Sequence, residues 1–348
     1  MDGGTEMSEH GDTLLTTRDE RQELIEPLLT PVRGFSHTTN PHNFTLLQIS
    51  TPIQGEMADE SLASSVSTAF SGSSGHDDGS PDLVFISADK VSFHTHYARV
   101  CNASSNNFNF LLPNSPEALT ETGVFQLAEE AAVLNVIFHC IYKLPFEIYD
   151  PALSTLLSVV VALQKYGLSL QQYLIIGTPL YQQMSLKTAS SPIDVYTVAA
   201  SNDLFDLASV ASSYLLSYPV DELSDEVSIT MGPVYLRRLF SLHTQRLKAL
   251  RALMASPPVE HPSTPACGEV EKKRLPRSWS LFCTSIAFYA TPDMSSVKLR
   301  SVLETLGELM LCDVCKQSLL DRVQELVVQW SAIPMTILRD PLGYRAGT

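Results

Sequence analysis

The sequence of 348 residues has little positive charge and no long apolar run. Its 23 Lys and Arg residues stand against 38 Asp and Glu residues, which gives a formal net charge of −15. Proteins that bind nucleic acid or anionic membranes normally present Lys and Arg to phosphate, so this balance argues against both partners. The longest apolar stretches, residues 153–163 and 281–290, are shorter than the ~20 residues needed to cross a bilayer, and they predict buried helices.

The sequence also lacks the features of a secretory leader. The first ten residues contain acids where a leader has basic residues, and no apolar segment of the required type follows them. We therefore expect a cytoplasmic or nuclear chain, and the basic run Lys272–Arg277 is of the kind that nuclear import receptors recognise. In either compartment, the six cysteines are expected to be reduced thiols without disulfides.

Motifs of nucleotide and ester chemistry are absent as well. No Gly-rich loop ends in Gly-Lys-Ser or Gly-Lys-Thr, and the run Ser71–Gly75 lacks the strand-turn-helix setting of a hydrolase nucleophile. His94 and His96 alternate in an extended segment, so they point to opposite faces and suit a shared metal poorly. His139 lies in an apolar helix, where a histidine usually packs in the core. The sequence thus predicts a protein that is not an enzyme.

Residues 1–80 differ from the rest of the chain. They mix Ser, Thr, Gly, Asp and Glu with few aromatic residues, and this composition predicts a disordered acidic tail. Within it, the segment Thr17–Leu29 is interpreted either as a docking peptide for another protein or as a transiently helical part of the tail. Its apolar residues are Leu24, Ile25, Leu28 and Leu29.

From residue 81 onward, short β-branched segments are followed by long apolar ones. Alternating β-branched and aromatic residues bounded by turn formers predict strands, and apolar residues that recur every three or four positions predict helices. The expected fold class is α+β, with a small sheet covered by helices in a domain spanning residues 81–180. The strands are predicted at residues 82–87, 91–93, 110–112 and 124–127, and the helices at residues 96–107, 133–142 and 153–165.

The remainder of the chain predicts helices only. An all-helical extension covers residues 181–256, and a Pro- and charge-rich linker covers residues 257–278. A C-terminal helical unit is expected over residues 279–340. The helices predicted in these parts span residues 194–216, 235–254, 279–289, 295–311 and 313–332.

Three segments carry a family resemblance. The run Phe93-His-Thr-His96-Tyr-Ala-Arg-Val100-Cys-Asn-Ala-Ser-Ser-Asn-Asn-Phe108 has a strand Phe, a helix-opening His, an apolar residue and a closing Phe. Val133–Tyr142 ends in an Ile-Tyr pair, and Ala162-Leu-Gln-Lys-Tyr-Gly-Leu168 follows. In this order and spacing, the segments resemble the BTB/POZ family, and in particular degenerate fungal BTB-like proteins with a helical C-terminal extension.

The resemblance implies a non-catalytic protein-interaction adaptor or scaffold. Members of the family form homodimers or contact partners through the first helix and the sheet edge, and some recruit substrates to a cullin ubiquitin ligase or act in transcriptional complexes. We therefore expect protein partners, including a second copy of the chain or a cullin. The resemblance assigns partner contacts to Phe93, His96, Tyr97 and Val100, and a cullin contact to Leu119 and Glu121.

Cys312-Asp-Val-Cys315 has the spacing of a chelating pair, but a structural zinc site needs four ligands. His261 and Cys267 would complete the set only if distant parts of the sequence come together. The sequence by itself therefore favours no cofactor, with Cys312 and Cys315 as small apolar residues one helical turn apart. The alternative is a metal-stabilised structural or regulatory protein that uses His261, Cys267, Cys312 and Cys315.

Overall fold

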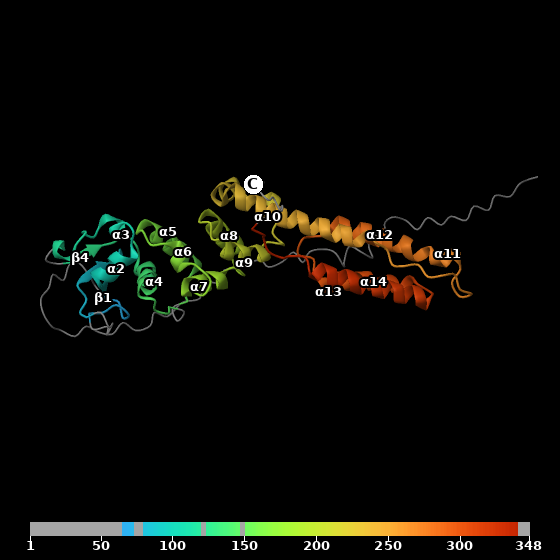
Figure 1. The fold of residues 1–348 in the computed structure, drawn as a ribbon, viewed down its shortest axis with the longest axis horizontal. Coiled ribbons are helices and arrows are strands. Elements are labelled where there is room, and N and C mark those ends of the chain that lie inside the picture. The colour runs from blue at the N-terminus through green and yellow to red at the C-terminus, as the bar shows by residue number, and fades with distance from the viewer. Residues whose placement is uncertain (1–64, 73–78, 120–122, 147–149, 340–348) are drawn as a thin grey trace, which may run out of the picture. The chain divides into compact units, whose positions relative to one another are not determined.

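The computed structural model describes residues 65–72, 79–119, 123–146 and 150–339. These residues form two compact units, and the chain has the expected α+β composition (Figure 1). We call the first the sheet unit; it contains the described residues up to His243 together with residues 334–339. The second, the C-terminal unit, comprises Thr244–Ile333. No helix in the described ranges is both long and apolar enough to cross a membrane.

Four short strands form the sheet, in the order β1-β3-β2-β4. The two central strands make an antiparallel hairpin in which Phe85 lies opposite Phe93, and the two outer strands run parallel to their neighbours. The hairpin and the strand near residue 124 confirm the prediction. The strands are β1 (Ser65–Val66), β2 (Leu83–Ile86), β3 (Val91–Thr95) and β4 (Val124–Gln126).

The segment 110–112 is not the strand that alternation predicted. Four consecutive residues, Asn107–Phe110, instead have positive φ angles in a short element, α3. The side chain of Ser104 accepts a hydrogen bond from the amide of Phe108 at 2.7 Å, and Asn106 caps the element. Ser and Asn side chains compete in this way with a strand ladder, and the turn carries Phe108 into the core.

The polar tail ends earlier than its composition indicated. Within the range predicted as disordered, residues 65–72 contain β1 and the fully buried Phe70. The backbone carbonyl of Phe70 accepts a hydrogen bond from the amide of His94 at 2.8 Å, which continues the pairing beside β3. A single aromatic residue in a Ser-rich sequence therefore anchors this segment to the sheet.

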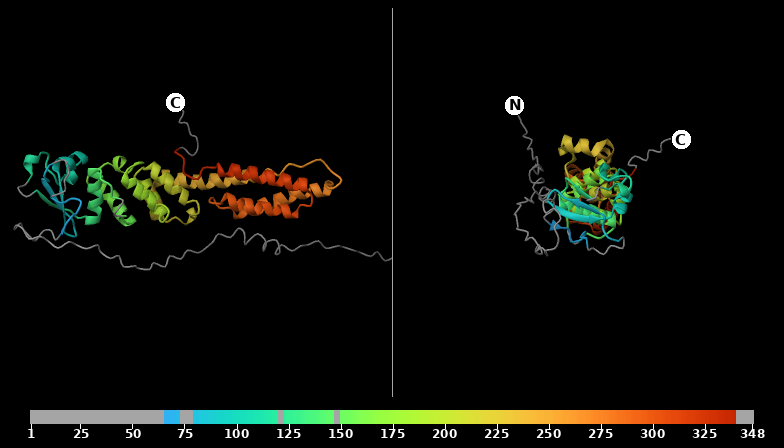
Figure 2. Two further views of the ribbon diagram at one scale, coloured as in Figure 1. Left: turned by 90° about the horizontal axis from the view of Figure 1, so that it is seen from below. Right: turned by 90° about the vertical axis from the view of Figure 1, so that its left-hand side faces the viewer.

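Helices extend the sheet unit away from the strands (Figures 1 and 2). One hydrophobic core runs from Phe70 to Leu242, so the predicted domain at 81–180 and most of the predicted extension pack together. The run predicted at 194–216 is two helices, because the chain turns at Asp203, which has a φ of 52°. The helices are α2 (Tyr97–Ala103), α4 (Ala131–Tyr142), α5 (Leu153–Lys165), α6 (Leu170–Tyr173), α7 (Pro179–Lys187), α8 (Pro192–Ser201) and α9 (Phe205–Tyr214).

Helix α10 (Asp225–Met254) kinks at Gly232–Pro233 and continues into the C-terminal unit. The core of that unit contains both tryptophans of the chain, Trp279 and Trp330. Part of the predicted linker is helical, because the apolar face of α12 begins at the buried Leu275, one turn before Trp279. The other helices are α11 (Glu269–Lys272), α12 (Arg274–Tyr289), α13 (Ser296–Glu304) and α14 (Asp313–Ser331).

Candidate metal centre

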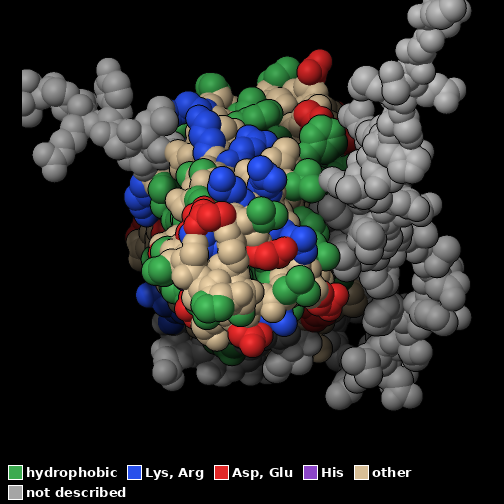
Figure 3. All heavy atoms as spheres, turned by 90° about the vertical axis from the view of Figure 1, so that its right-hand side faces the viewer, with side chains coloured by type: hydrophobic (Ala, Val, Ile, Leu, Met, Phe, Trp, Pro, Cys, Tyr) green, Lys and Arg blue, Asp and Glu red, His purple; other side chains and the backbone are tan. Residues whose placement is uncertain are grey.

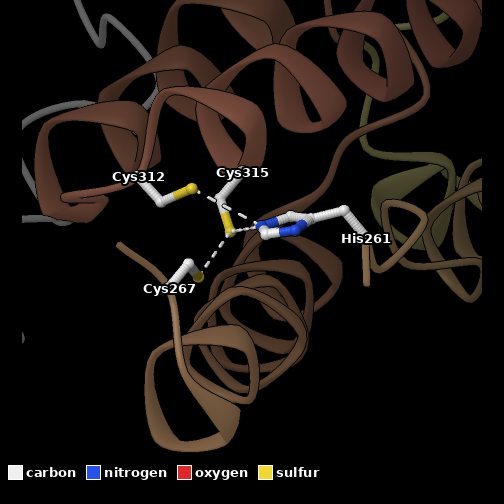
Figure 4. A group of neighbouring side chains, drawn as sticks. All are labelled: His261, Cys267, Cys312 and Cys315. Atoms are coloured by element: carbon white, nitrogen blue, oxygen red, sulfur yellow. Dashed lines mark hydrogen bonds between the residues drawn. The ribbon is translucent and has the colours of Figure 1, made fainter. Parts of the chain in front are cut away.

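Four potential metal ligands converge in the C-terminal unit (Figure 4). Their ligand atoms, one imidazole nitrogen and three thiol sulfurs, all lie within 4.8 Å of one another. Two come from the start of α14 and two from the segment before α11. The residues are His261, Cys267, Cys312 and Cys315.

The start of α14 positions the Cys-x-x-Cys pair. Cys312 is the N-cap residue, in an extended conformation, and Cys315 lies in the first turn. The backbone amides of Cys315 and Val314 lower the pKa of the Cys312 thiol. The first amides of a helix have no partner within the helix, so they stabilise negative charge on a thiolate at the N-cap. The spacing thus directs both sulfurs to one side of the helix start.

A tight turn presents Cys267. The backbone amide of Thr264 donates to the carbonyl of Cys267 at 3.1 Å, and the amide of Cys267 donates to the carbonyl of Thr264 at 3.0 Å. Pro265 and Ala266 occupy the turn between them. The imidazole Nδ1 of His261 lies 2.7 Å from the carbonyl of Pro262, which fixes Nδ1–H as the donor and leaves the Nε2 lone pair facing the thiols.

Polar contacts join the segment between α10 and α11 to α14. The Ser318 hydroxyl donates to the carbonyl of Val259 at 2.6 Å, and Nε of Arg322 donates to the carbonyl of Ser256 at 2.9 Å. The Trp279 indole donates to the carbonyl of Met254 at 3.0 Å, at the end of α10. The segment before α11 is therefore held against the helices independently of the four ligands.

Three of the separations between ligand atoms are close to those of a tetrahedron around zinc. With Zn–S of ~2.3 Å and Zn–N of ~2.0–2.1 Å, tetrahedral angles require S···S of ~3.8 Å and S···N of ~3.6 Å. The sulfurs of Cys267 and Cys315 are 3.8 Å apart. Nε2 of His261 is 3.5 Å from the Cys312 sulfur and 3.2 Å from the Cys315 sulfur. A disulfide needs ~2.05 Å, and all six cysteines are free thiols.

The thiols differ in acidity. The amides of Cys315 and Val314 lower the pKa of the Cys312 thiol to about 7. Burial and the two neighbouring thiols raise the pKa of Cys315 to about 12, and burial likewise raises the pKa of Cys267. Three thiolates at this separation repel one another, so they can be ionised together only beside a cation.

The structure thus brings together the ligand set that the sequence offered only as an alternative. The expectation of no cofactor rested on the distance in sequence between His261, Cys267 and the Cys312–Cys315 pair. In the folded chain, the ligand atoms of all four residues lie close together. Cys267 and Cys315 are buried, whereas His261 and Cys312 are half-buried. This His and Cys₃ group can hold a metal ion such as zinc.

The residues predicted to contact partners lie elsewhere. Phe93, His96, Tyr97 and Val100 are all at most 7% exposed and belong to the interior of the sheet unit. The Tyr142 hydroxyl lies 2.8 Å from both the backbone amide and Nδ1 of His96. These four side chains therefore stabilise the fold, because the strand and first helix that carry them turn inward onto α4.

The predicted cullin contact is only partly described. Leu119 is half-buried and packs against the core of the sheet unit, whereas Glu121 falls outside the described residues. Sequence reasoning missed the role of Phe70, because its surroundings have no strand pattern. It gave the four metal ligands only as an alternative, because no local pattern predicts that the segment before α11 folds back onto α14.

The chain matches no protein-family model, and no curated protein or solved structure gives a significant match.

Proposed function

We propose that the C-terminal unit is a zinc-stabilised helical unit in a protein that acts by binding other proteins. The observation that carries this proposal is the convergence of one imidazole nitrogen and three sulfurs within 4.8 Å of one another, with three of their separations close to those of a tetrahedral zinc site. Four protein ligands leave no coordination position for water or substrate. The site is therefore structural, since a catalytic zinc keeps one position open.

The metal would secure a part of the unit that buries little apolar surface. Between the end of α10 and the start of α12, Cys267 is the one residue of the described chain that joins the main core of the unit. Zinc would join this segment to the start of α14, because each of them supplies two of the four ligands. In small zinc-binding domains, metal affinity of this kind contributes directly to folding stability.

Metal analysis of the purified full-length chain tests the site. We expect about one zinc per chain, lost in the variant Cys315→Ser and kept in Cys283→Ser. Cys283 is a matched control because it is also a buried free thiol of the same unit but lies outside the ligand set. Thermal unfolding followed by tryptophan fluorescence should shift to lower temperature in Cys315→Ser, since both tryptophans report this unit. A wild-type chain without zinc after purification from zinc-supplemented cells would contradict the proposal.

For the sheet unit, we propose a BTB/POZ-like interaction domain. Support comes from the element order, in which a hairpin is followed by a helix and a third strand parallel to the first strand of the hairpin. Two surface hollows of about 650 and 660 Å³ contain one ionisable side chain between them, Glu129. That carboxylate is already paired with Lys165 and Tyr166, so these hollows offer no general acid or base.

Sedimentation equilibrium of the full-length chain tests self-association, and titration with a purified cullin N-terminal domain tests the second type of partner. A concentration-dependent dimer or a saturable cullin complex supports the interaction domain. A chain that stays monomeric at ~100 µM and also fails to bind the cullin would contradict the proposal.

A further inference from the structure

Large apolar side chains are exposed around the four metal ligands. Val259, Val270, Leu311 and Val314 are 80, 80, 77 and 51% exposed. We call these four residues the metal-flanking patch. Each lies within three residues of a ligand in the sequence, and the ligand atoms lie within 4.8 Å of one another. Single exposed apolar residues need no explanation, but several at one site can form a small binding surface.

The patch residues lie on elements that the metal ligands bring together, and one hydrogen bond joins Val259 to α14. The backbone of Val259 is bonded to Ser318, one turn along α14 from Val314. Leu311 immediately precedes the N-cap Cys312, and Val270 lies in α11 just after Cys267. Figure 3 looks onto the side of the C-terminal unit at which α11 lies. It shows hydrophobic side chains among charged ones, with Lys and Arg gathered in one part of this face and Asp and Glu beside them.

The size of the patch excludes a second copy as its sole occupant. A fully buried Val or Leu side chain removes ~60–120 Å² from water, so four at these exposures offer on the order of 250 Å². Two such patches together fall well below the ~1,200 Å² of a stable specific interface. The surface therefore suits a short apolar segment rather than a folded partner.

The charge of the C-terminal unit favours an occupant with acidic residues. The C-terminal unit has eleven Lys and Arg residues against nine Asp and Glu residues, although the whole chain is strongly acidic. Lys273 and Arg277, close in sequence to the patch, are exposed, and neither is held in an ion pair within the described part of the chain. An occupant should thus combine apolar side chains with acidic ones.

The chain contains such a segment. Thr17–Leu29 has four large apolar residues, Leu24, Ile25, Leu28 and Leu29. Its four acids, Asp19, Glu20, Glu23 and Glu26, outnumber its two arginines. We propose that the metal-flanking patch binds this acidic, leucine-rich segment of the chain itself, within one molecule or between two, and that the metal holds the patch in its binding arrangement. The proposal rests on the zinc site proposed above.

A labelled peptide tests the contact. The probe is a fluorescein-labelled peptide of residues 15–31, titrated by fluorescence anisotropy with the full-length chain. In that chain Leu24, Ile25, Leu28 and Leu29 are replaced by Ser, so that its own segment does not compete. We expect saturable binding, weakened at least ~10-fold when the same four positions of the peptide are replaced by Ser.

Matched protein variants locate the contact. The double variant Leu311→Ser/Val314→Ser should weaken binding at least ~10-fold, whereas Phe288→Ser/Val297→Ser should leave it unchanged. Phe288 and Val297 are 81 and 78% exposed in the same unit but lie away from the metal ligands in the sequence. Metal content is measured in every sample, and zinc removal by a chelator should also weaken binding.

The outcomes separate this proposal from the zinc site. A zinc-loaded chain that does not bind the peptide, or binds it equally well in the Leu311→Ser/Val314→Ser variant, overturns the docking proposal and leaves the zinc site intact. Peptide binding that survives complete zinc removal overturns the proposed role of the metal in holding the patch. A wild-type chain that contains no zinc overturns the proposed zinc site itself.

Discussion

Replacing Phe70 by Ala should destabilise the sheet unit strongly. The Phe70 side chain is fully buried, and its ring lies 5.7 Å from that of Phe138 and 5.3 Å from that of Tyr142, between ring centres. It also meets His139 edge-on at 5.1 Å. Removing a buried Phe typically costs ~3–5 kcal/mol, because apolar contacts are lost and a cavity remains.

The measurement is urea unfolding followed by far-UV circular dichroism. With a denaturant slope of ~2 kcal/mol per molar, a loss of ~4 kcal/mol lowers the unfolding midpoint of the sheet unit by about 2 M. The control is Val66→Ala on the same short segment, where the side chain is 52% exposed and the cost should remain within ~0.5 kcal/mol. Circular dichroism is needed because both tryptophans lie in the other unit.

A loss below ~1 kcal/mol for Phe70→Ala, or one no larger than that of Val66→Ala, would refute the reasoning. Such a result would mean that residues 65–72 are not part of the folded unit, and that the tail extends to residue 80 as its composition indicated.

Three further predictions concern the sheet unit. Ile337→Ala should destabilise the sheet unit by ~2–4 kcal/mol in urea unfolding, because Ile337 is 2% exposed and its amide donates to the Ser212 hydroxyl. The control Met335→Ala, at a 53% exposed position, should have little effect. Tyr142→Phe should cost ~1–3 kcal/mol in the same assay, since the buried amide of His96 loses its acceptor; an unchanged midpoint would contradict the contact. Burial raises the pKa of Glu129, but hydrogen bonds from Lys165 and Tyr166 outweigh this effect and leave the pKa lowered. The stability that this carboxylate contributes is therefore present above the ordinary pKa of Glu and is lost as pH falls through the lowered value. The difference in urea midpoint between wild type and Glu129→Gln should be largest near neutral pH and shrink below ~pH 4. A difference that does not depend on pH would refute this assignment.

The periodicity of the sequence determined much of the secondary structure. The hairpin at β2 and β3 follows from alternating apolar residues around a turn, and α5 has the predicted bounds, because its apolar residues recur at helical spacing. The Cys-x-x-Cys pair was likewise visible as a chelating element. These features depend on residues close together in the sequence, for which local geometry suffices.

The tertiary structure decided the features that join distant residues. Phe70 enters the core although its neighbours are Ser and Gly, because one large aromatic side chain gains enough from burial to order a short polar segment. Phe93, His96, Tyr97 and Val100 proved internal, since periodicity shows that residues share a face but not what covers that face. His261 and Cys267 reach the Cys312–Cys315 pair through the turn at Thr264–Cys267 and the packing of the C-terminal unit, and no local pattern in the sequence encodes that meeting.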